Sequence, residues 1–245
     1  MKRIYIGTSG WSYKSWERSF YPAGLSASRH FEFYASQFST VEINLTFYRL
    51  PAAKMVEGWR DKAPAGFVYA AKGSRFITHM KKLVDAGEAL DGFFDRIRPL
   101  QRRIGVILWQ LPPMFHKDAG KLDAFLSQLP RAYHHAVEFR HGSWLDEEIF
   151  ETLHRHGAAH VSVSSQLMPR NLTVTADLVY IRFHGLTGGA AHDYTREELA
   201  PWVEHIRAQA AKGKTVYAYF NNDVKVRAPA NARLLIELCR VGAGE

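Results

Sequence analysis

Short apolar runs alternate with longer segments of helical periodicity along the whole chain. Runs rich in β-branched and aromatic residues predict strands, and apolar residues three and four positions apart predict helices. The predicted strands are Ile4–Gly7, Thr40–Leu45, Phe67–Lys72, Ile104–Leu108, Ala136–Arg140, His160–Ser164, Val179–His184 and Val216–Phe220. The predicted helices are Phe31–Gln37, Ala53–Lys62, Leu90–Leu100, Lys121–Gln128, Glu147–His156, Arg196–Lys212 and Ala230–Arg240. Gly157 and Gly213 follow two of these helices, and Pro51 and Pro229 precede two others, as expected of helix ends.

Strands that alternate with helices indicate a parallel sheet, either an open doubly wound sheet or a closed barrel. The barrel is favoured because the strand count is eight and polar residues fall at the carboxyl ends of nearly all the strands. We therefore predict that residues 1–245 form a single α/β domain, an irregular (β/α)8 TIM-type barrel. The segment between Ser164 and Val179 is too short and too irregular in its apolar spacing for a full helix, so we predict that the helix after strand six is short or missing. The long loop from Thr8 to His30 is expected to cover part of the barrel mouth.

Charged residues at alternate positions of the strands indicate which side chains face the barrel interior, because the helix-facing side must be apolar. By this parity Glu42, Asn44 and Thr46 face inward on strand two. The other inward residues are Lys72 and Ser74 with Arg75 just beyond, Glu138 and Arg140, Arg182 and His184, and Tyr217, Tyr219 and Asn221 with Asn222 and Asp223 at the tip. The sequence thus predicts a polar pocket at the carboxyl ends of the strands.

The inward charges do not balance. Glu42 and Glu138 are negative, whereas Lys72, Arg140 and Arg182 are positive. Because an unpaired buried charge costs several kcal/mol, these groups must largely neutralise one another. The surplus positive charge favours an anionic ligand, and arginine binds phosphate in a bidentate manner. The alternative is a closed salt-bridge network that specifies the fold and binds nothing.

Motifs from one end of the chain to the other resemble those of the YecE-like family, a domain of unknown function. They are Gly7-Thr8-Ser9-Gly10-Trp11, Val41-Glu42-Ile43-Asn44 with Thr46-Phe47-Tyr48, Lys72-Gly73-Ser74-Arg75 with Ile77-Thr78-His79, Gln110-Leu111-Pro112-Pro113, Glu138-Phe139-Arg140-His141 with Trp144, Arg182-Phe183-His184-Gly185, and Tyr219-Phe220-Asn221-Asn222-Asp223 with Ala228-Pro229-Ala230-Asn231-Ala232. The resemblance implies a TIM-type barrel and no particular reaction. This chain departs from it at Ser164-Ser165, where many members carry an aspartate, and at 224–227, where many carry a glycine.

The segment from Trp11 to Tyr21 mixes aromatic and basic residues in the loop after strand one. Such a segment stacks bases or sugars in some proteins, but packing of the loop onto the barrel is the more common role. His79, His141 and His184 lie near strand ends, and with Glu42 and Glu138 they offer a mixed nitrogen and oxygen metal site. The neighbouring cations would repel a metal, so we predict no cofactor and keep the metal site as the weaker alternative.

Composition narrows the classes further. The formal charge of +8 attracts anions in general, including phosphorylated metabolites and nucleic acid. The single cysteine, Cys239, excludes an internal disulfide, suits a reducing compartment and is expected to be buried in the last helix. No signal peptide or membrane span is apparent, so we expect a cytoplasmic protein that does not bind a membrane. No Walker loop, dinucleotide fingerprint, Cys-x-x-Cys pair or nucleophile elbow is present, which disfavours nucleotide cofactors and serine-hydrolase chemistry.

The leading hypothesis is an enzyme, a hydrolase, lyase or isomerase, that acts on a small anionic, phosphorylated or polyhydroxylated substrate. In it Arg140 and Arg182 hold the anion, and Glu42 and Glu138 share the acid–base work. His184 is a second proton carrier and Lys72 gives electrostatic support. Further substrate contacts are expected from Arg75, Asn44, Tyr48, Trp11, His141, Tyr219, Asn221, Asn222 and Asp223. The alternatives are a nucleic-acid-binding protein or phosphodiesterase, and a non-catalytic binding protein with a relic pocket.

Overall fold

The computed structural model describes residues 4–240 and contains eight parallel strands in one sheet. They are β1 Ile4–Thr8, β2 Thr40–Ile43, β3 Val68–Lys72, β4 Ile104–Gln110, β5 His135–Glu138, β6 Ala159–Ser165, β7 Leu178–Gly185 and β8 Thr215–Phe220. Their order is β1-β8-β7-β6-β5-β4-β3-β2, and a parallel bridge between Ser9 and Glu42 joins the two ends of that order. This order with alternating helices defines the (β/α)8 fold class, so the predicted class is confirmed.

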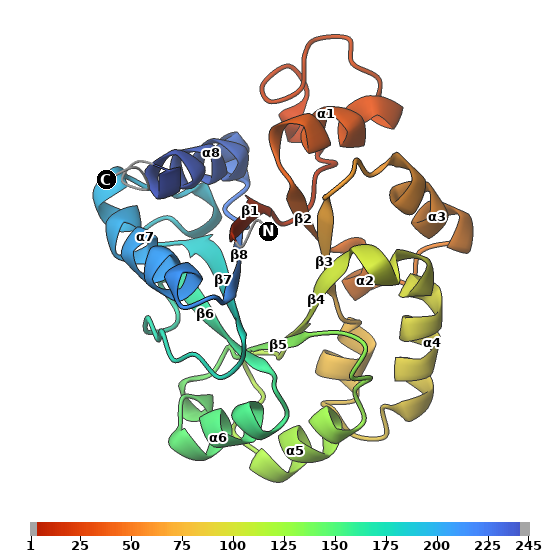
Figure 1. Ribbon diagram of the computed structural model, residues 1–245, viewed down its shortest axis with the longest axis vertical. Helices are drawn as coiled ribbons and strands as arrows, with labels where there is room; N and C mark the ends of the chain where they lie inside the picture. The colour runs from red at the N-terminus through yellow and green to blue at the C-terminus, as the bar shows by residue number, and fades with distance from the viewer. Residues whose placement is uncertain (1–3, 241–245) are drawn as a thin grey trace. The chain divides into compact units, whose positions relative to one another are not determined.

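Helices alternate with the strands along the chain, as predicted (Figure 1). They are α1 His30–Gln37, α2 Leu45–Tyr48, α3 Ala53–Lys62, α4 Gly87–Ile97, α5 Ala119–Ser127, α6 Glu147–Arg155, α7 Arg196–Ala211 and α8 Arg227–Arg240. A capping box of Thr195 and Glu198 begins α7. Gly157 and Gly213 lie after α6 and α7 with φ of 63° and 88°, the left-handed conformation that ends helices and that glycine adopts without strain. None of the helices within residues 4–240 combines the length and the hydropathy needed to cross a bilayer.

Several predicted boundaries are wrong, mostly at the carboxyl ends of strands. The strand predicted to reach Leu45 ends at Ile43, and Asn44 precedes the short helix α2. Thr46 therefore lies outside the strand, and its hydroxyl donates to the carbonyl of Lys72 at 2.7 Å. The strand predicted to reach Arg140 likewise ends at Glu138. Asn44 thus stands one position, and Arg140 two positions, beyond the end of its strand.

The helix ends differ in a similar way. The helix predicted at Leu90–Leu100 begins at Gly87 and ends at Ile97, where a 3-10 segment, η4 Arg98–Arg103, follows it. The last helix begins at Arg227, so Pro229 lies inside its first turn rather than before it. Proline is tolerated there because the first backbone N–H groups of a helix have no partner within the helix. Cys239 is buried in α8, as predicted.

The connection between β6 and β7 contains no helix in residues 166–177, which confirms the predicted irregularity. Thr175 holds this connection to the strand before it. Its hydroxyl donates to the carbonyl of Ala158 at 2.7 Å and accepts from the backbone N–H of His160 at 2.8 Å. Side-chain hydrogen bonds thus replace the packing of a crossover helix.

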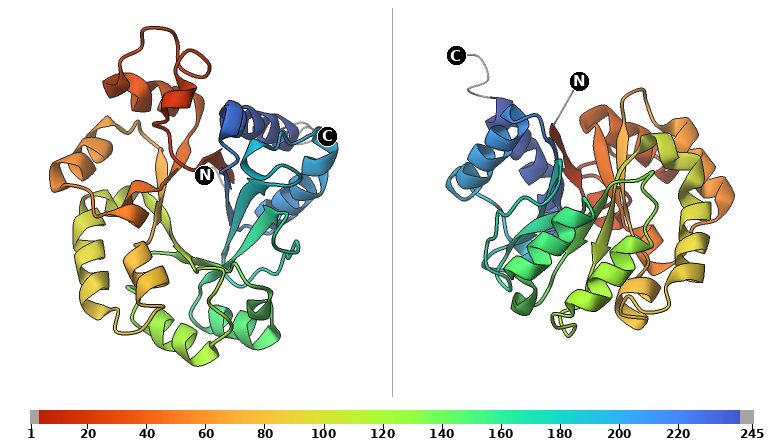
Figure 2. Two further views of the ribbon diagram at one scale, coloured as in Figure 1. Left: turned by 180° about the vertical axis from the view of Figure 1, so that it is seen from behind. Right: turned by 60° about the horizontal axis from the view of Figure 1, so that its bottom comes forward.

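Two compact units divide the described chain. Unit 1 comprises residues 4–42, 162–172 and 178–240, and unit 2 comprises residues 43–161 and 173–177. In unit 1, α7 and α8 lie side by side along β7, β8 and β1 (Figure 2). In unit 2, α5 and α6 lie side by side, and the core is rich in aromatic rings, among them those of Trp109, Phe125 and Phe139.

The loop after β1 is packed into unit 1 by its aromatic residues. Trp16 is fully buried and lies against Tyr13, Phe20, Tyr21 and Tyr34, with ring centroids 5.0 to 6.4 Å away. A buried ring has no face left for a base or a sugar. The packing interpretation of this loop therefore holds for Trp16.

Candidate functional site

In unit 1 the carboxylate of Glu42 is surrounded by hydrogen-bond donors. Its Oε1 accepts from Arg182 at 2.7 Å and from the hydroxyl of Ser9, and its Oε2 accepts from the hydroxyl of Tyr180 at 2.6 Å. Arg182 also donates to Ser9 at 3.1 Å. Glu42 comes from the end of β2, Ser9 follows β1, and Tyr180 and Arg182 occupy one face of β7. The ladder of parallel strands thus brings residues from three strands to one carboxylate.

This network is buried, since the side chains of Glu42 and Arg182 are 0% and 1% exposed. Burial raises the pKa of Tyr180 well above its ordinary value, and the negative charge of Glu42 acts in the same direction. The phenol therefore stays protonated and donates to the carboxylate. Because both oxygens of Glu42 already accept strong hydrogen bonds, this carboxylate is better suited to hold Arg182 and Ser9 in place than to transfer a proton.

At the end of β8, Asp223 is half-buried and accepts a hydrogen bond of 2.5 Å from the indole Nε1 of Trp16. Burial raises the pKa of Asp223 to about 6, although the hydrogen bond from Trp16 lowers it. A carboxyl group that titrates near neutral pH is a suitable general acid or base. Lys225 and Val226 follow with φ of 59° and 61°, in the left-handed region that glycine adopts without strain.

The other predicted residues of unit 1 occupy different environments. The amide Nδ2 of Asn221 lies 3.3 Å from Nδ1 of the half-buried His184. Asn222 is buried, and its amide donates to the carbonyl of His192 and to Asn231 at 2.8 and 2.7 Å, so it fastens the loop before α7 to α8. Tyr219 is fully buried and hydrogen bonded to Thr40 at 2.7 Å, and Trp11 packs edge-on against Phe31. Asn222 and Tyr219 therefore have structural contacts instead of a ligand-facing surface.

In unit 2, Glu138 at the end of β5 forms an ion pair with Arg140. Glu138 is fully buried, whereas the side chain of Arg140 is 20% exposed. The guanidinium of Arg140 also lies 3.5 Å from the amide oxygen of Gln110, at the end of β4. Arg140 is therefore held from two sides and still reaches solvent.

Three cations act on one histidine in the same unit. The pKa of His79 is lowered by burial and, in decreasing order, by the charges of Lys72, Arg75 and Arg140. Lys72 ends β3, and its Nζ lies 4.0 Å from the centre of the Phe47 ring, which in turn packs edge-on against His79 at 5.1 Å. Positive charge therefore accumulates at the carboxyl ends of β3 and β5.

The remaining predicted residues of unit 2 lie on the loops that follow the strands. Asn44 precedes α2, and Tyr48, the last residue of α2, is 65% exposed beside Phe47. His141 accepts a hydrogen bond from the backbone N–H of Ser143 and stacks on His116 with ring centroids 3.9 Å apart. In unit 2, therefore, Lys72, Arg75, Glu138 and Arg140 share one cluster, whereas His141 belongs to a neighbouring loop.

The metal alternative finds no support in residues 4–240, where no three His, Cys, Asp or Glu side chains are grouped so as to hold an ion. His79 instead bonds to the hydroxyl of Thr78 at 2.9 Å, and His184 bonds to Asn221. Each histidine thus has a local partner of its own.

Three residues that the structure places in these clusters, Tyr180, Ser9 and Gln110, were not among the inward residues predicted by strand parity. Tyr180 stands two positions before Arg182 on the same face of β7, so the same argument could have found it. Ser9 and Gln110 stand at the carboxyl ends of β1 and β4, the position that singled out the other residues. The influence of Lys72, Arg75 and Arg140 on His79 depends on the π-helical segment η3 Phe76–Met80, which no sequence signal predicted.

Comparison with known proteins gives matches along nearly the whole chain. Residues 5–244 match the family model described as "Protein of unknown function DUF72". The UPF0759 protein YunF of Bacillus subtilis is 25% identical over 272 residues, which cover 96% of this chain and 94% of that protein. The crystal structure of a DUF72 family protein from Thermotoga maritima has a TM-score of 0.88 and 30% identity, with 98% of this chain and 100% of the other covered. A DUF72 family protein from Enterococcus faecalis, with a TM-score of 0.84, 19% identity and coverage of 98% and 96%, shares the fold. These descriptions state no activity.

Proposed function

The chain belongs to the family described as protein of unknown function DUF72, and on that premise we propose that it is an enzyme for a small anionic substrate. The proposed substrate is phosphorylated or polyhydroxylated. The observation that supports the proposal most is the joint action of Lys72, Arg75 and Arg140 on His79. Because like charges held close together repel one another, an anion bound among these groups would be stabilised by all of them.

In unit 2, Arg140 is the proposed anchor of the anion. Its ion pair with Glu138 and its contact with Gln110 fix the planar guanidinium, which suits bidentate binding of a phosphate or carboxylate. Lys72 and Arg75 add positive charge. His79 is neutral at pH 7 because its pKa is lowered, so it is able to accept a proton as a general base.

Unit 1 contains a proposed proton carrier of its own, Asp223, since burial raises its pKa to about 6. This assignment replaces the sequence-based hypothesis that Glu42 transfers a proton, because Glu42 is saturated with hydrogen bonds. We propose that Glu42 and Arg182 act as positioning residues that hold the ends of β1, β2 and β7. His184 remains the second proton carrier of the hypothesis, with Asn221 fixing its ring.

A histidine titration followed by NMR tests the anion site. Inorganic phosphate and glucose 6-phosphate serve as probes, each at constant ionic strength. A bound anion offsets the cations, so the pKa of His79 is expected to rise on addition of either probe. Arg140→Met is expected to weaken binding by about tenfold or more, because a charge-assisted hydrogen bond is lost.

Arg60→Ala is the matched control, since it removes an exposed guanidinium from α3 of the same unit. It should leave both the titration and the affinity unchanged. An unaltered pKa of His79 at saturating phosphate, or an equal loss of affinity in the two variants, would contradict the proposal.

Glu138→Gln separates an enzyme from a binding protein. If Glu138 takes part in a reaction only by orienting Arg140, turnover of a phosphorylated metabolite should fall while the free energy of unfolding changes little. If Glu138 is purely structural, the free energy of unfolding of the variant should fall, and the wild type should turn over none of the phosphorylated metabolites that are tested. The second outcome favours the relic-pocket alternative.

Nucleic-acid binding is less well supported than the small-anion site. The net charge of +8 favours it, but the central aromatic of the loop after β1, Trp16, is buried. Titration with single- and double-stranded oligonucleotides at low salt decides the matter, since such binding weakens steeply as salt is added.

A further inference from the structure

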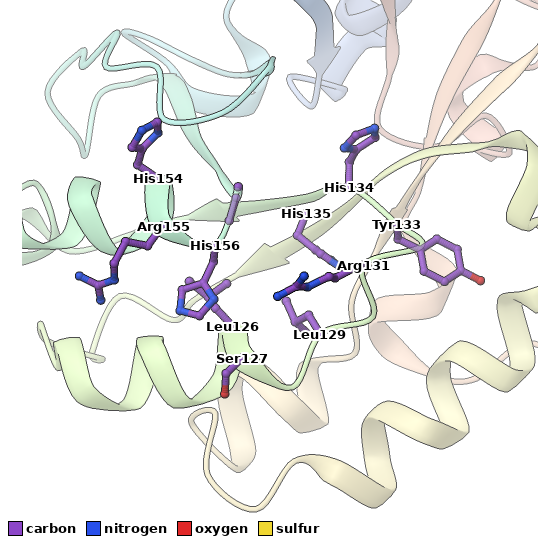
Figure 3. A pocket seen from close by; sticks show the side chains of 12 residues that line it. Leu126, Ser127, Leu129, Arg131, Tyr133, His134, His135, His154, Arg155 and His156 are labelled. Carbon is purple, nitrogen blue, oxygen red and sulfur yellow. The ribbon is translucent and has the colours of Figure 1, made fainter.

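A pocket of about 550 Å³ lies in unit 2 at the amino-terminal ends of β5 and β6 (Figure 3). Its walls are the ends of α5 and α6, the loop before β5 and the turn into β6. His135 begins β5 in this pocket, whereas Glu138 ends the same strand. The pocket is therefore at the opposite strand end from the residues of the proposed function, and it requires an explanation of its own.

The charge of the lining is one-sided. Of the twelve described residues that line it, four are histidines and two are arginines, and none is acidic. Arg155 and His156 both contact Asp123 at 2.9 Å, just outside the lining, and Asp123 offsets the charge of Arg155. Arg131 comes from the loop before β5, and in Figure 3 its side chain extends toward the side on which His156 lies. The lining thus favours a negatively charged ligand.

Hydrogen bonds fix the orientation of two of the histidines. His135 is buried, with Nε2 3.0 Å from the carbonyl of Pro130 and Nδ1 accepting from Trp109 at 3.3 Å. Burial lowers the pKa of His135 to about 4, so this ring is a neutral part of the wall. Nδ1 of His154 lies 3.2 Å from the carbonyl of Thr175 and donates to it, which leaves Nε2 as the ring atom that a ligand would meet.

The floor of the pocket, formed by two leucines and an alanine, is apolar. Leu126, Leu129 and Ala158 are buried, and Tyr133 stacks on Phe94 with ring centroids 5.1 Å apart. A pocket of this size is large enough for a small organic molecule, and Leu126, Leu129 and Ala158 offer an apolar surface beside its polar groups. Flat rings on the walls suit a planar ligand.

We propose that this pocket binds a small planar organic anion, a phosphate or carboxylate carried on an aromatic body. Arg131 binds the anionic group, His134 and His154 contribute polar contacts at the rim, and the aromatic body lies on the leucine floor. This site does not depend on the proposed function, because no residue is shared between the two.

Calorimetry and histidine NMR of the full chain test the proposal with four probes. Adenosine 5′-monophosphate represents the planar phosphates and 1-naphthoate the planar carboxylates, while adenosine and inorganic phosphate each supply one half of the ligand. At least one of the two planar anions should bind and shift the ring signals of His134 and His154. Adenosine and inorganic phosphate should bind about tenfold more weakly or less. The proposal is overturned if neither planar anion shifts these signals, or if adenosine binds as tightly as its monophosphate.

Variants locate the binding. Arg131→Ala and His134→Ala change exposed residues, so both should fold with an unchanged Tm. Arg131→Ala should weaken the planar anion by about tenfold, and His134→Ala should weaken it less. Arg60→Ala is the matched control and should have no effect. Undiminished binding in Arg131→Ala, or a loss that appears only in Arg140→Met, would place the ligand elsewhere and overturn the proposal.

Discussion

A glutamate–arginine pair lies at the strand ends of each unit, and the two pairs differ in burial. Glu42 and Arg182 come from β2 and β7, 140 positions apart, and their side chains are 0% and 1% exposed. Glu138 and Arg140 are two positions apart at the end of β5, and the side chain of Arg140 is 20% exposed. The carboxylate of the first pair also accepts from Ser9 and Tyr180, whereas the arginine of the second pair belongs to a group of cations around His79.

The same two residue types therefore serve different ends. A fully buried pair is stable only when its remaining hydrogen-bond capacity is satisfied, and this requirement fixes the strands that carry it. A pair that is open on one side keeps an arginine oriented while leaving it able to bind a ligand. The comparison predicts that breaking the first pair mainly destabilises the fold, and that breaking the second mainly affects binding.

The largest expected effect follows from Arg182→Met. This change leaves Glu42 as a buried carboxylate without its cation, so the free energy of unfolding should fall by about 3–5 kcal/mol. Guanidinium unfolding followed by tryptophan fluorescence measures the loss. Arg140→Met should cost about 1–3 kcal/mol, because Arg140 is partly exposed and water is able to enter where its guanidinium is removed.

The double variant Glu42→Gln/Arg182→Met is the control for a charge effect. It removes the stranded charge, and the amide keeps one oxygen that accepts from Ser9 or Tyr180 while its NH2 group is able to donate to the other hydroxyl. The double variant should therefore be about 1 kcal/mol or more stable than Arg182→Met alone. If the single variants at Arg182 and Arg140 lose equal stability, the distinction between a closed and an open pair is wrong.

A second effect concerns acid stability in unit 2. His160 is buried next to Glu138, and burial lowers the pKa of His160 from 6.5 to about 4. The unfolded chain then binds a proton that the folded chain does not, so its contribution to stability is complete above pH 6.5 and is lost as the pH falls toward 4. The loss amounts to about 3 kcal/mol.

His160→Asn tests this assignment. The asparagine amide is able to replace Nδ1, which lies 3.3 Å from the carbonyl of Thr173. The variant should be less stable at pH 7, because the ring packs against Phe150, but its further loss between pH 6.5 and pH 4 should be about 3 kcal/mol smaller than that of the wild type. Parallel stability curves for the two proteins would count against it.

The fold class was predictable because the alternation of strands and helices in a barrel follows from local hydrophobic patterns in the sequence. The eight apolar runs correspond to the eight strands, and glycines such as Gly157 follow the ends of helices. The irregular segment before β7 contains no helix. The resemblance to a family of unknown function is confirmed by the match over residues 5–244. Strand ends were less predictable. The strands before Asn44 and Arg140 end where backbone hydrogen bonding stops, and the hydrophobic pattern does not mark that position.

Which charges pair with which was not predictable from the sequence. Parity placed Glu42, Glu138, Arg140 and Arg182 on inward faces, but pairing depends on strand register and on residues such as Tyr180 that carry no charge pattern. Asp223 is a similar case. Its sequence position marks a strand end, but its raised pKa comes from burial, and its hydrogen-bond partner Trp16, which lowers the pKa, lies 207 positions away.

The smallest expected effect tests Asp223 and has the opposite sign from that of His160. Burial raises the pKa of Asp223 from 3.8 to about 6, so between these values the folded chain binds a proton that the unfolded chain does not. Stability from this group is therefore present below pH 4 and is lost as the pH rises through 6. Because the side chain is only half-buried, solvent screening reduces the effect to about 1 kcal/mol.

Asp223→Asn keeps an oxygen for the indole of Trp16, so its free energy of unfolding should match that of the wild type at pH 4 and exceed it by about 1 kcal/mol at pH 7. Chemical unfolding of the variant and the wild type at pH 4 and pH 7 measures the difference in their free energies of unfolding. If that difference is the same at both pH values, Asp223 is already ionised below neutral pH and is not the proton carrier of unit 1.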